Sequence, residues 1–372
     1  MKFRAAIVVF AGVSLASLGV LPLRVRAQSP AAGQPQKTAG EQFKNVRVLK
    51  DIPADQLIPA MQFITASLGV DCEYCHVEHA FDKDDKKPKV AARKMMEMMM
   101  NINKENFDAH RAVTCYSCHR GAAKPVGVPV ITAEVKMPEM MAGDAMTPSN
   151  LPKPEDLLGK YLAAVGGAGA LEKIKTRVEK GSITTFGNKQ FPIEIYSKAP
   201  DMRVSVTRFG QGESVTAFNG KMGWLQVPGR VHMMNAQESA EAGIDADMAF
   251  AANVSKMYAK FSTREGEQID GRDTWLVVGR NEGQPPLKLY LDKNTGLLVR
   301  MERYLDSPLG YNPTQIDYAD YRDSEGVKIP YQWTVARPNS RFTVQVMDVR
   351  TNVPVDDAKF APPPLPPPPP AH

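Results

Sequence analysis

The sequence predicts an α+β protein with two domains, a mostly α-helical module followed by an antiparallel, curved β-sheet of half-barrel type. Apolar residues recur at helical spacing in the first third of the chain, whereas short alternating strands and hairpin turns dominate the last two hundred or so residues. A chain of 372 residues, 43% of them hydrophobic, is long enough for two cores. We expect the helical module at 45–125 and the β domain at 155–355.

Residues 1–27 are typical of an export signal. Two basic residues precede a long apolar run over 5–23, and a site suited to signal peptidase ends at Ala27. We expect cleavage there, a flexible linker over 28–44, and a location in the periplasm or at the periplasmic face of the inner membrane. The alternative is an uncleaved anchor, because the apolar run is nearly long enough to span a bilayer.

The net charge argues against one class of partner. The formal charge of +5 falls to +1 when residues 1–27 are removed, because that segment holds four basic residues and no acidic one. A nearly neutral chain lacks the basic surface that nucleic acid requires. We therefore expect no nucleic-acid partner.

All four cysteines fall in two copies of the pattern C-x-x-C-H. Two thiols three residues apart can each form a thioether with one haem vinyl group, and the adjacent histidine can bind the iron. Cysteine pairs also occur in zinc sites, redox dithiols and structural disulfides, but those sites do not require a histidine directly after each pair. The sequence thus predicts two covalently bound haem c groups, attached at Cys72-Glu73-Tyr74-Cys75-His76 and Cys115-Tyr116-Ser117-Cys118-His119.

An iron that only transfers electrons needs a sixth ligand, commonly methionine or a second histidine. Upstream of the first motif, residues 59–68 predict a helix that begins at Pro59 and carries Met61 on its apolar face. Upstream of the second motif, residues 90–102 predict a helix with a methionine-rich stripe. Spacing alone does not choose among its five methionines, most of which we expect to pack. The expected stripe is Met95, Met98, Met99 and Ile102.

The stretch from Asn45 to Gly121 resembles the cytochrome c subunit of photosynthetic reaction centres. The resemblance rests on a repeated unit of helix, C-x-x-C-H and return, in the segments LKDIPADQLIPAMQFITASLGVDCEYCH, ARKMMEMMMNINKENF and VTCYSCHRG. The chain departs from the family in having two haem motifs rather than four, and its C-terminal two-thirds is not further cytochrome.

The resemblance implies the axial ligands. Met61 and His76 would bind the first iron, Met95 and His119 the second, and His110 is a reserve ligand. The other histidines have no such role: we expect His79 in a solvated loop, and His232 and His372 on the surface.

Two functional classes follow from these motifs. The first, which we favour, is an exported electron carrier that serves redox partner proteins, including a membrane-bound complex, and has no enzymatic activity. The second is a dihaem redox enzyme of the peroxidase kind, with one iron open to substrate. The methionines upstream of both motifs favour the carrier.

Residues 126–154 are rich in Pro, Met, Gly and Ala without periodicity, which indicates a linker. A short amphipathic helix is expected at 155–166, and a helical interruption at about 236–260 divides two sets of strands. Strands are predicted at 274–278, 287–291 and 342–346, with turns at Asn219-Gly220, Asp270-Gly271, Asn294-Thr295-Gly296 and Ser324-Glu325-Gly326.

This order of elements is similar to that of the lipoprotein carriers and outer-membrane lipoprotein-sorting proteins. The similarity rests on the hairpin patterns LKLYLDKNTGLLVRMERY and YADYRDSEGVKIPYQW. It implies a lipid or apolar ligand for the β domain, whereas a docking or scaffolding role would need no ligand. Within the Pro-rich tail at 356–372, the stretch APPPLPPPPPAH is expected to form an extended polyproline segment, either as a spacer or disordered.

Overall fold

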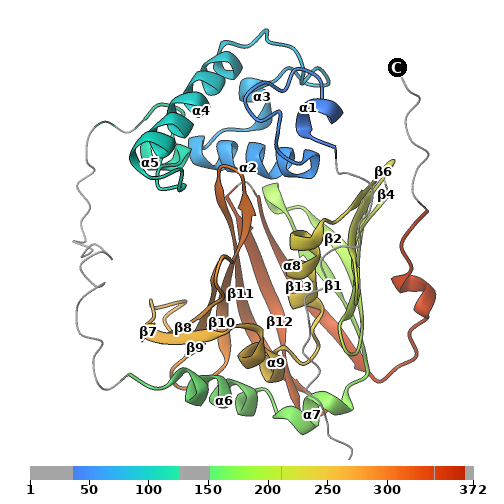
Figure 1. Cartoon of the computed structure of the whole chain (residues 1–372). Helices are drawn as coiled ribbons and strands as arrows, with labels where there is room; N and C mark the ends of the chain where they lie inside the picture. The colour runs from blue at the N-terminus through green and yellow to red at the C-terminus, as the bar shows by residue number, and fades with distance from the viewer. Residues whose placement is uncertain (1–36, 126, 128–150, 211, 339, 365–372) are drawn as a thin grey trace, which may run out of the picture. The chain divides into compact units, whose positions relative to one another are not determined.

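The structure is a computed structural model that describes residues 37–125, 127, 151–210, 212–338 and 340–364 (Figure 1). The predicted signal at 1–27 and His372 lie outside these residues. The helices are α1 (Ala39–Gln42), α2 (Leu57–Leu68), α3 (Cys72–Cys75), α4 (Lys87–Asn106), α5 (Cys115–His119), α6 (Pro154–Ala164), α7 (Ala168–Lys173), α8 (Ala236–Ala246) and α9 (Phe250–Met257). The strands are β1 (Thr176–Thr184), β2 (Gln190–Lys198), β3 (Met202–Phe209), β4 (Gly212–Asn219), β5 (Gly223–Val227), β6 (Arg230–Met233), β7 (Lys260–Glu265), β8 (Thr274–Arg280), β9 (Leu287–Asp292), β10 (Leu298–Ser307), β11 (Gly310–Ser324), β12 (Val327–Arg337) and β13 (Ser340–Thr351).

The helical module comprises α1 to α5. Helix α2 begins at Leu57, two residues before the predicted start, because the 3-10 turn Ala54–Gln56 leads directly into it. Helix α4 confirms the prediction upstream of the second motif and extends it at both ends. Ala39 is fully buried and Phe43 packs against the same core, so ordered packing begins inside the segment predicted as a linker.

The β domain is one antiparallel sheet of 13 strands in the order β6-β5-β4-β3-β2-β1-β13-β12-β11-β10-β9-β8-β7. Successive strands pair as hairpins within β1–β6 and within β7–β13, β6 and β7 form the two edges, and the first strand, β1, pairs with the last, β13, in the middle of the sheet. The predicted Asn-Gly, Asn-Thr-Gly and Ser-Glu-Gly turns join β4 to β5, β9 to β10 and β11 to β12. The α+β fold class is confirmed.

Helix α8 lies against the sheet and shows that the sheet curves. Helix α8 contacts β3, β4 and β5, and it also contacts β10. In the strand order of the sheet, β10 lies six positions away from β3. One helix can reach both sets only if the sheet bends around it. A bidentate ion pair fastens the helix: the guanidinium of Arg303 on β10, 4% exposed, donates to both carboxylate oxygens of Asp245 at 2.7 Å.

The turn between β10 and β11 packs into the helical module. The described residues of the helical module and of the sheet belong to one compact unit, and Leu309 at this turn, 1% exposed, belongs to the core made by Leu57 and Phe63. A Cβ at Gly310 would clash with the Phe63 ring. The guanidinium of Arg111 donates to Asp306 at 2.6 Å. The β domain therefore supplies part of the helical module's core (Figure 1).

The start of the Pro-rich tail predicted at 356–372 packs against the sheet. Residues Asp357–Phe360 form a 3-10 turn, and Phe360, 3% exposed, packs against Val204 and Trp224 of the sheet. Burial of one aromatic ring is enough to hold this part of the tail on the sheet. Residues 365–372 lie outside the described part.

Candidate functional site

The first C-x-x-C-H motif forms a single helical turn. Asp71 caps it, because its carboxylate accepts a hydrogen bond from the Tyr74 amide at 3.1 Å. In a helix, residues three apart share one face, so Cys72 and Cys75 present their thiols to the same side. His76 ends the turn with extended backbone angles. The motif therefore places two thiols on one capped helical turn and one imidazole directly after it.

The second motif is built in the same way. Thr114 caps α5, in a capping box with Ser117, and Arg120 ends the helix in the left-handed conformation. Asn103 of α4, 6% exposed, fixes the approach to this helix: its amide donates to the Val113 carbonyl at 2.7 Å and accepts from the Val113 amide at 2.9 Å.

Both motif histidines have the same hydrogen-bond arrangement. The Nδ1 of His76 lies 2.9 Å from the Phe81 carbonyl oxygen, and the Nδ1 of His119 lies 2.9 Å from the Ala122 carbonyl oxygen. A carbonyl can only accept, so each Nδ1 carries the hydrogen and each Nε2 keeps its lone pair. This is how proteins orient a histidine that binds a metal through Nε2.

The two motifs lie next to each other along the backbone. The Gly121 amide donates to the carbonyl of the buried Ser67 at 2.9 Å. Gly69 ends α2 in the left-handed conformation, with φ of 65°, and a Cβ there would clash with the Gly121 carbonyl. The first motif starts three residues after Gly69 and the second ends two residues before Gly121, so this contact brings the two attachment segments together.

The thiols do not have the properties of a redox dithiol. All four cysteines are free, and burial raises the pKa of Cys75 and of Cys115. A reactive dithiol requires the opposite shift, a lowered thiol pKa. Within the described part of the chain, no three His, Cys, Asp or Glu side chains gather closely enough to hold a metal ion between them.

The methionines of α4 divide into two groups. Met96 and Met99 are each 7% exposed and form part of the core, whereas Met95 is 45% and Met98 is 48% exposed. Of the predicted stripe, Met99 is buried as expected, whereas Met95 and Met98 face outward, because the helix turns the positions 96, 99 and 103 inward. On α2, Met61 is half-buried at the edge of the same core.

The remaining described histidines outside the motifs have different settings. His110 is exposed, with Nδ1 3.2 Å from the Phe107 carbonyl, and His79 is exposed in a loop as expected. His232, expected on the surface, is half-buried, and its Nε2 lies 2.9 Å from a Glu238 carboxylate oxygen. The capping box at the start of α8 turns that glutamate back toward β6.

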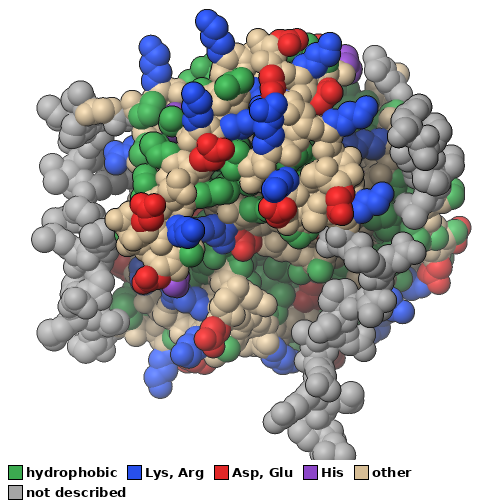
Figure 2. All heavy atoms as spheres, turned by 45° about the horizontal axis from the view of Figure 1, so that its top comes forward, with side chains coloured by type: hydrophobic (Ala, Val, Ile, Leu, Met, Phe, Trp, Pro, Cys, Tyr) green, Lys and Arg blue, Asp and Glu red, His purple; other side chains and the backbone are tan. Residues whose placement is uncertain are grey.

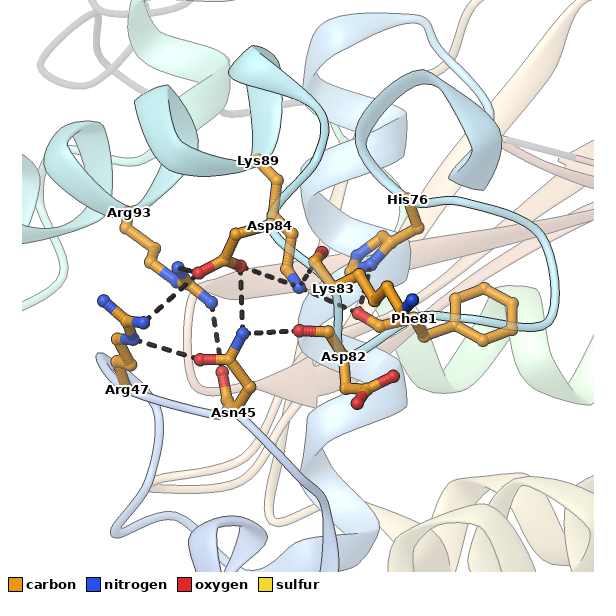
Figure 3. A network of polar contacts seen from close by, with 9 residues as sticks. All are labelled: Asn45, Arg47, His76, Phe81, Asp82, Lys83, Asp84, Lys89 and Arg93. Carbon is orange, nitrogen blue, oxygen red and sulfur yellow. Dashed lines mark hydrogen bonds and ion pairs between the residues drawn. The ribbon is translucent and has the colours of Figure 1, made fainter.

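A polar network behind His76 was not predicted (Figure 3). The Phe81 carbonyl that accepts from His76 also accepts from Lys89 Nζ at 2.9 Å, and Lys89 forms an ion pair with Asp84 at 3.1 Å. Lysine is rarely buried, and nothing local in the sequence marks Lys89, 8% exposed, as different from the lysines beside it.

The surface of the helical module is rich in exposed apolar side chains. Figure 2 shows them among Lys, Arg, Asp and Glu side chains of both signs. A porphyrin is a large apolar plane, so a module that binds it must present such groups near the attachment points. Tyr74 and Tyr116 lie within the two motifs themselves. The exposed set in this module is Ile58, Tyr74, Phe81, Val90, Met95, Met98, Phe107 and Tyr116.

The β domain holds an apolar hollow of about 230 Å³. The hollow lies between the sheet and the tail, and its lining includes Tyr196, Val206 and Trp224. None of the helices among the described residues is both long and apolar enough to cross a membrane.

Comparisons with solved structures find similarity at low TM-scores. An outer membrane lipoprotein-sorting protein domain from Vibrio parahaemolyticus is 12% identical, with a TM-score of 0.39, and covers 56% of this chain and 97% of that one. A LolA superfamily protein from Nitrosomonas europaea is 11% identical, with a TM-score of 0.38, and covers 57% of this chain and 99% of that one.

Comparisons with characterised sequences concern the N-terminal part. The photosynthetic reaction center cytochrome c subunit of Thermochromatium tepidum is 39% identical over 101 residues, which are 26% of this chain and 25% of that protein. Cytochrome c-554 of Chloroflexus aurantiacus is 34% identical over 85 residues, which are 21% of this chain and 20% of that protein. The match thus spans a quarter or less of these relatives. Residues 21–191, somewhat less than half of the chain, match the model of one family, that of the photosynthetic reaction centre cytochrome C subunit.

Proposed function

We propose that the protein is an exported c-type cytochrome that carries electrons through two covalently bound haem c groups. Cys72 and Cys75 would attach the first haem and Cys115 and Cys118 the second. The observation that carries this proposal is the repeated C-x-x-C-H turn, in which each histidine is held by a backbone carbonyl with its Nε2 left for iron. The names of the relatives, all cytochromes, support the same class.

The haem groups would supply the one-electron chemistry, and the chain supplies attachment and orientation. The Phe81 and Ala122 carbonyls fix the tautomer of His76 and His119 and raise the basicity of each imidazole. The exposed apolar side chains give each porphyrin an apolar lining. The contact between Gly69 and Gly121 keeps the attachment segments adjacent, as transfer between two centres requires.

We further propose Met61 and Met95 as the sixth ligands. Met96 and Met99 are committed to the core, whereas the Met95 thioether on the same helix is exposed and free to bind iron. Met61 lies at the edge of the core on the helix that leads to the first motif. His110, exposed with its Nδ1 near a backbone carbonyl, is the alternative ligand.

The physiological partners are proposed from the relatives. The relative from Thermochromatium tepidum is named as a subunit of the photosynthetic reaction center, so we propose that this protein exchanges electrons with redox partner proteins, including a membrane-bound complex, on the periplasmic side. The β domain would serve as a docking or scaffolding part of the chain, with a lipid or apolar ligand as the alternative role.

Optical spectroscopy of the purified mature protein tests the proposal. A pyridine haemochrome assay counts covalent haem, and the oxidised spectrum shows whether a methionine binds ferric iron, through a far-red band. Two haems, both low-spin and indifferent to carbon monoxide and peroxide, are expected. One high-spin iron that binds either molecule would instead indicate a peroxidase-like dihaem enzyme.

A further inference from the structure

We propose that Lys89 and Asp84 are positioning residues for His76 and that together they set the reduction potential of the first haem apart from that of the second. The inference rests on the proposed function and concerns a pair of side chains that are not among the proposed iron ligands or haem attachment residues. Its basis is the network behind His76 (Figure 3).

Lys89 shares a hydrogen-bond acceptor with His76. The Phe81 carbonyl oxygen lies 2.9 Å from His76 Nδ1 and 2.9 Å from Lys89 Nζ. Lys89 also donates to the Lys83 carbonyl at 2.7 Å, so its ammonium group holds the loop at two points. With only 8% of the residue exposed, this cation acts with little screening by water.

Asp84 holds the lysine in place. Its carboxylate pairs with Lys89 at 3.1 Å, with Arg93 at 2.9 Å and with Arg47 at 3.2 Å, and it accepts from the Asn45 amide at 2.9 Å. Arg93, Lys89 and Asn45 together hold the pKa of the Asp84 carboxyl far below its usual range. The loop after the first motif is thereby fixed to α4 and to the chain that precedes α2.

Lys89 would act on the first haem iron through its positive charge and through its hydrogen bond to the Phe81 carbonyl. Ferric haem carries one more positive charge than ferrous haem, so a nearby cation favours the reduced state. A carbonyl that also accepts from an ammonium group is a weaker acceptor for His76, which makes the imidazole less basic and again favours the reduced state. Both effects raise the potential of the first haem, and Asp84 moderates them.

The second motif has a different environment. The Ala122 carbonyl accepts from His119, and among the residues that the structure describes no lysine or arginine donates to it. Two motifs with the same ligand types therefore differ in this contact. A difference in potential between the two haems is the consequence, and it would give electron flow within the protein a direction.

Redox titration of full-length holoprotein variants tests the proposal. In Lys89→Met we expect one of the two reduction waves to move to lower potential, with about a tenfold change in its equilibrium constant, which is about 59 mV for a one-electron couple. In Asp84→Asn we expect the same wave to move to higher potential, because the Phe81 and Lys83 carbonyls still hold Lys89 while the negative charge near it is removed. Lys104→Met is the matched control, because it removes an exposed cation from the same helix and should leave both waves in place.

Opposite shifts from Lys89→Met and Asp84→Asn cannot arise from a general loss of structure. Unchanged potentials in Lys89→Met, equal shifts of both waves, or shifts of the same sign in the two variants would overturn the inference. A haemochrome assay on each sample separates this outcome from failure of the proposed function, because a protein without covalent haem would show no waves at all.

Discussion

At the scale of the residue, the histidines are distinguished by their partners. His76 and His119 donate to backbone carbonyls, which cannot ionise, whereas His232 pairs with a carboxylate. The hydrogen bond that His232 donates to the Glu238 carboxylate raises the pKa of His232 against the effect of burial. Burial alone would raise the pKa of Glu238, but His232 and the Asn235 amide bring it below its usual value.

These pKa shifts predict the pH range in which the ion pair between His232 and Glu238 stabilises the fold. The raised pKa of His232 gives stability that is complete below its unfolded value, about 6.5, and is lost as pH rises through the folded value. The lowered pKa of Glu238 gives stability present above its unfolded value, about 4.3, and lost as pH falls through the folded value. We expect Glu238→Gln to reduce the unfolding free energy by up to about 1 kcal/mol at pH 5.5 and by less at pH 8.5.

Urea unfolding at both pH values measures this difference. The control is Glu172→Gln, which changes an exposed glutamate on α7. An equal loss of unfolding free energy at the two pH values would show that Glu238 acts only as a cap of α8.

The exposed methionines of α4 predict a spectroscopic difference. Met95→Leu should remove about half of the far-red absorbance, because one of two irons loses its methionine, and should leave that iron able to bind carbon monoxide. Met98→Leu changes a neighbour of similar exposure and should alter neither property. Retention of the full band in Met95→Leu would exclude Met95 as a ligand.

At the scale of the element, local signals and distant contacts differ in how well they could be predicted. The turns were predictable because Asn219-Gly220 and Asn294-Thr295-Gly296 act within a few residues. The pairing of β1 with β13 was not, because no local pattern joins strands from opposite ends of the domain.

The candidate haem site also combines features that the local sequence predicts with features that depend on distant contacts. The cysteines and proximal histidines follow from their spacing, but which face of α4 is buried depends on the packing of α2 and of Leu309 against it. The burial of Lys89 depends on a loop whose course the sequence does not reveal.

The conformation of Gly69 at the end of α2 predicts how much folding stability one added methyl group would cost. Gly69→Ala would force a left-handed conformation on alanine and press its Cβ against Gly121, so we expect a loss of about 1–3 kcal/mol. Gly159→Ala, in the exposed interior of α6 with open space around it, should instead stabilise by up to about 1 kcal/mol. Thermal unfolding of both variants measures the contrast, and equal effects would contradict the close contact.

At the scale of the whole molecule, the two parts share a core. Leu309 comes from the β domain but is buried among residues of α2 and α4, and the Asn312 amide donates to the Pro59 carbonyl at 3.1 Å. The helical module is therefore not a separate cytochrome joined to a separate sheet, because its packing is completed by a hairpin from the other end of the chain.

This shared core predicts that a change in the sheet weakens the haem module. Leu309→Ala should cost about 2–5 kcal/mol, the usual range for a buried leucine, and should lower the denaturant concentration at which haem absorbance changes. Leu225→Ala removes a leucine that is 36% exposed on β5 and should cost much less. If haem absorbance responded equally to both, the hairpin would not be part of the module's core.

The position of this hairpin also orders events during synthesis. Ser307 lies 196 residues after Arg111, so during export the two C-x-x-C-H motifs would emerge well before the hairpin. In that interval the module lacks Leu309, and the enzymes that ligate haem to cysteine thiols would meet a loosely packed substrate. Arrival of the hairpin would then complete the packing around the bound cofactors, so that maturation proceeds from cofactor attachment to closure.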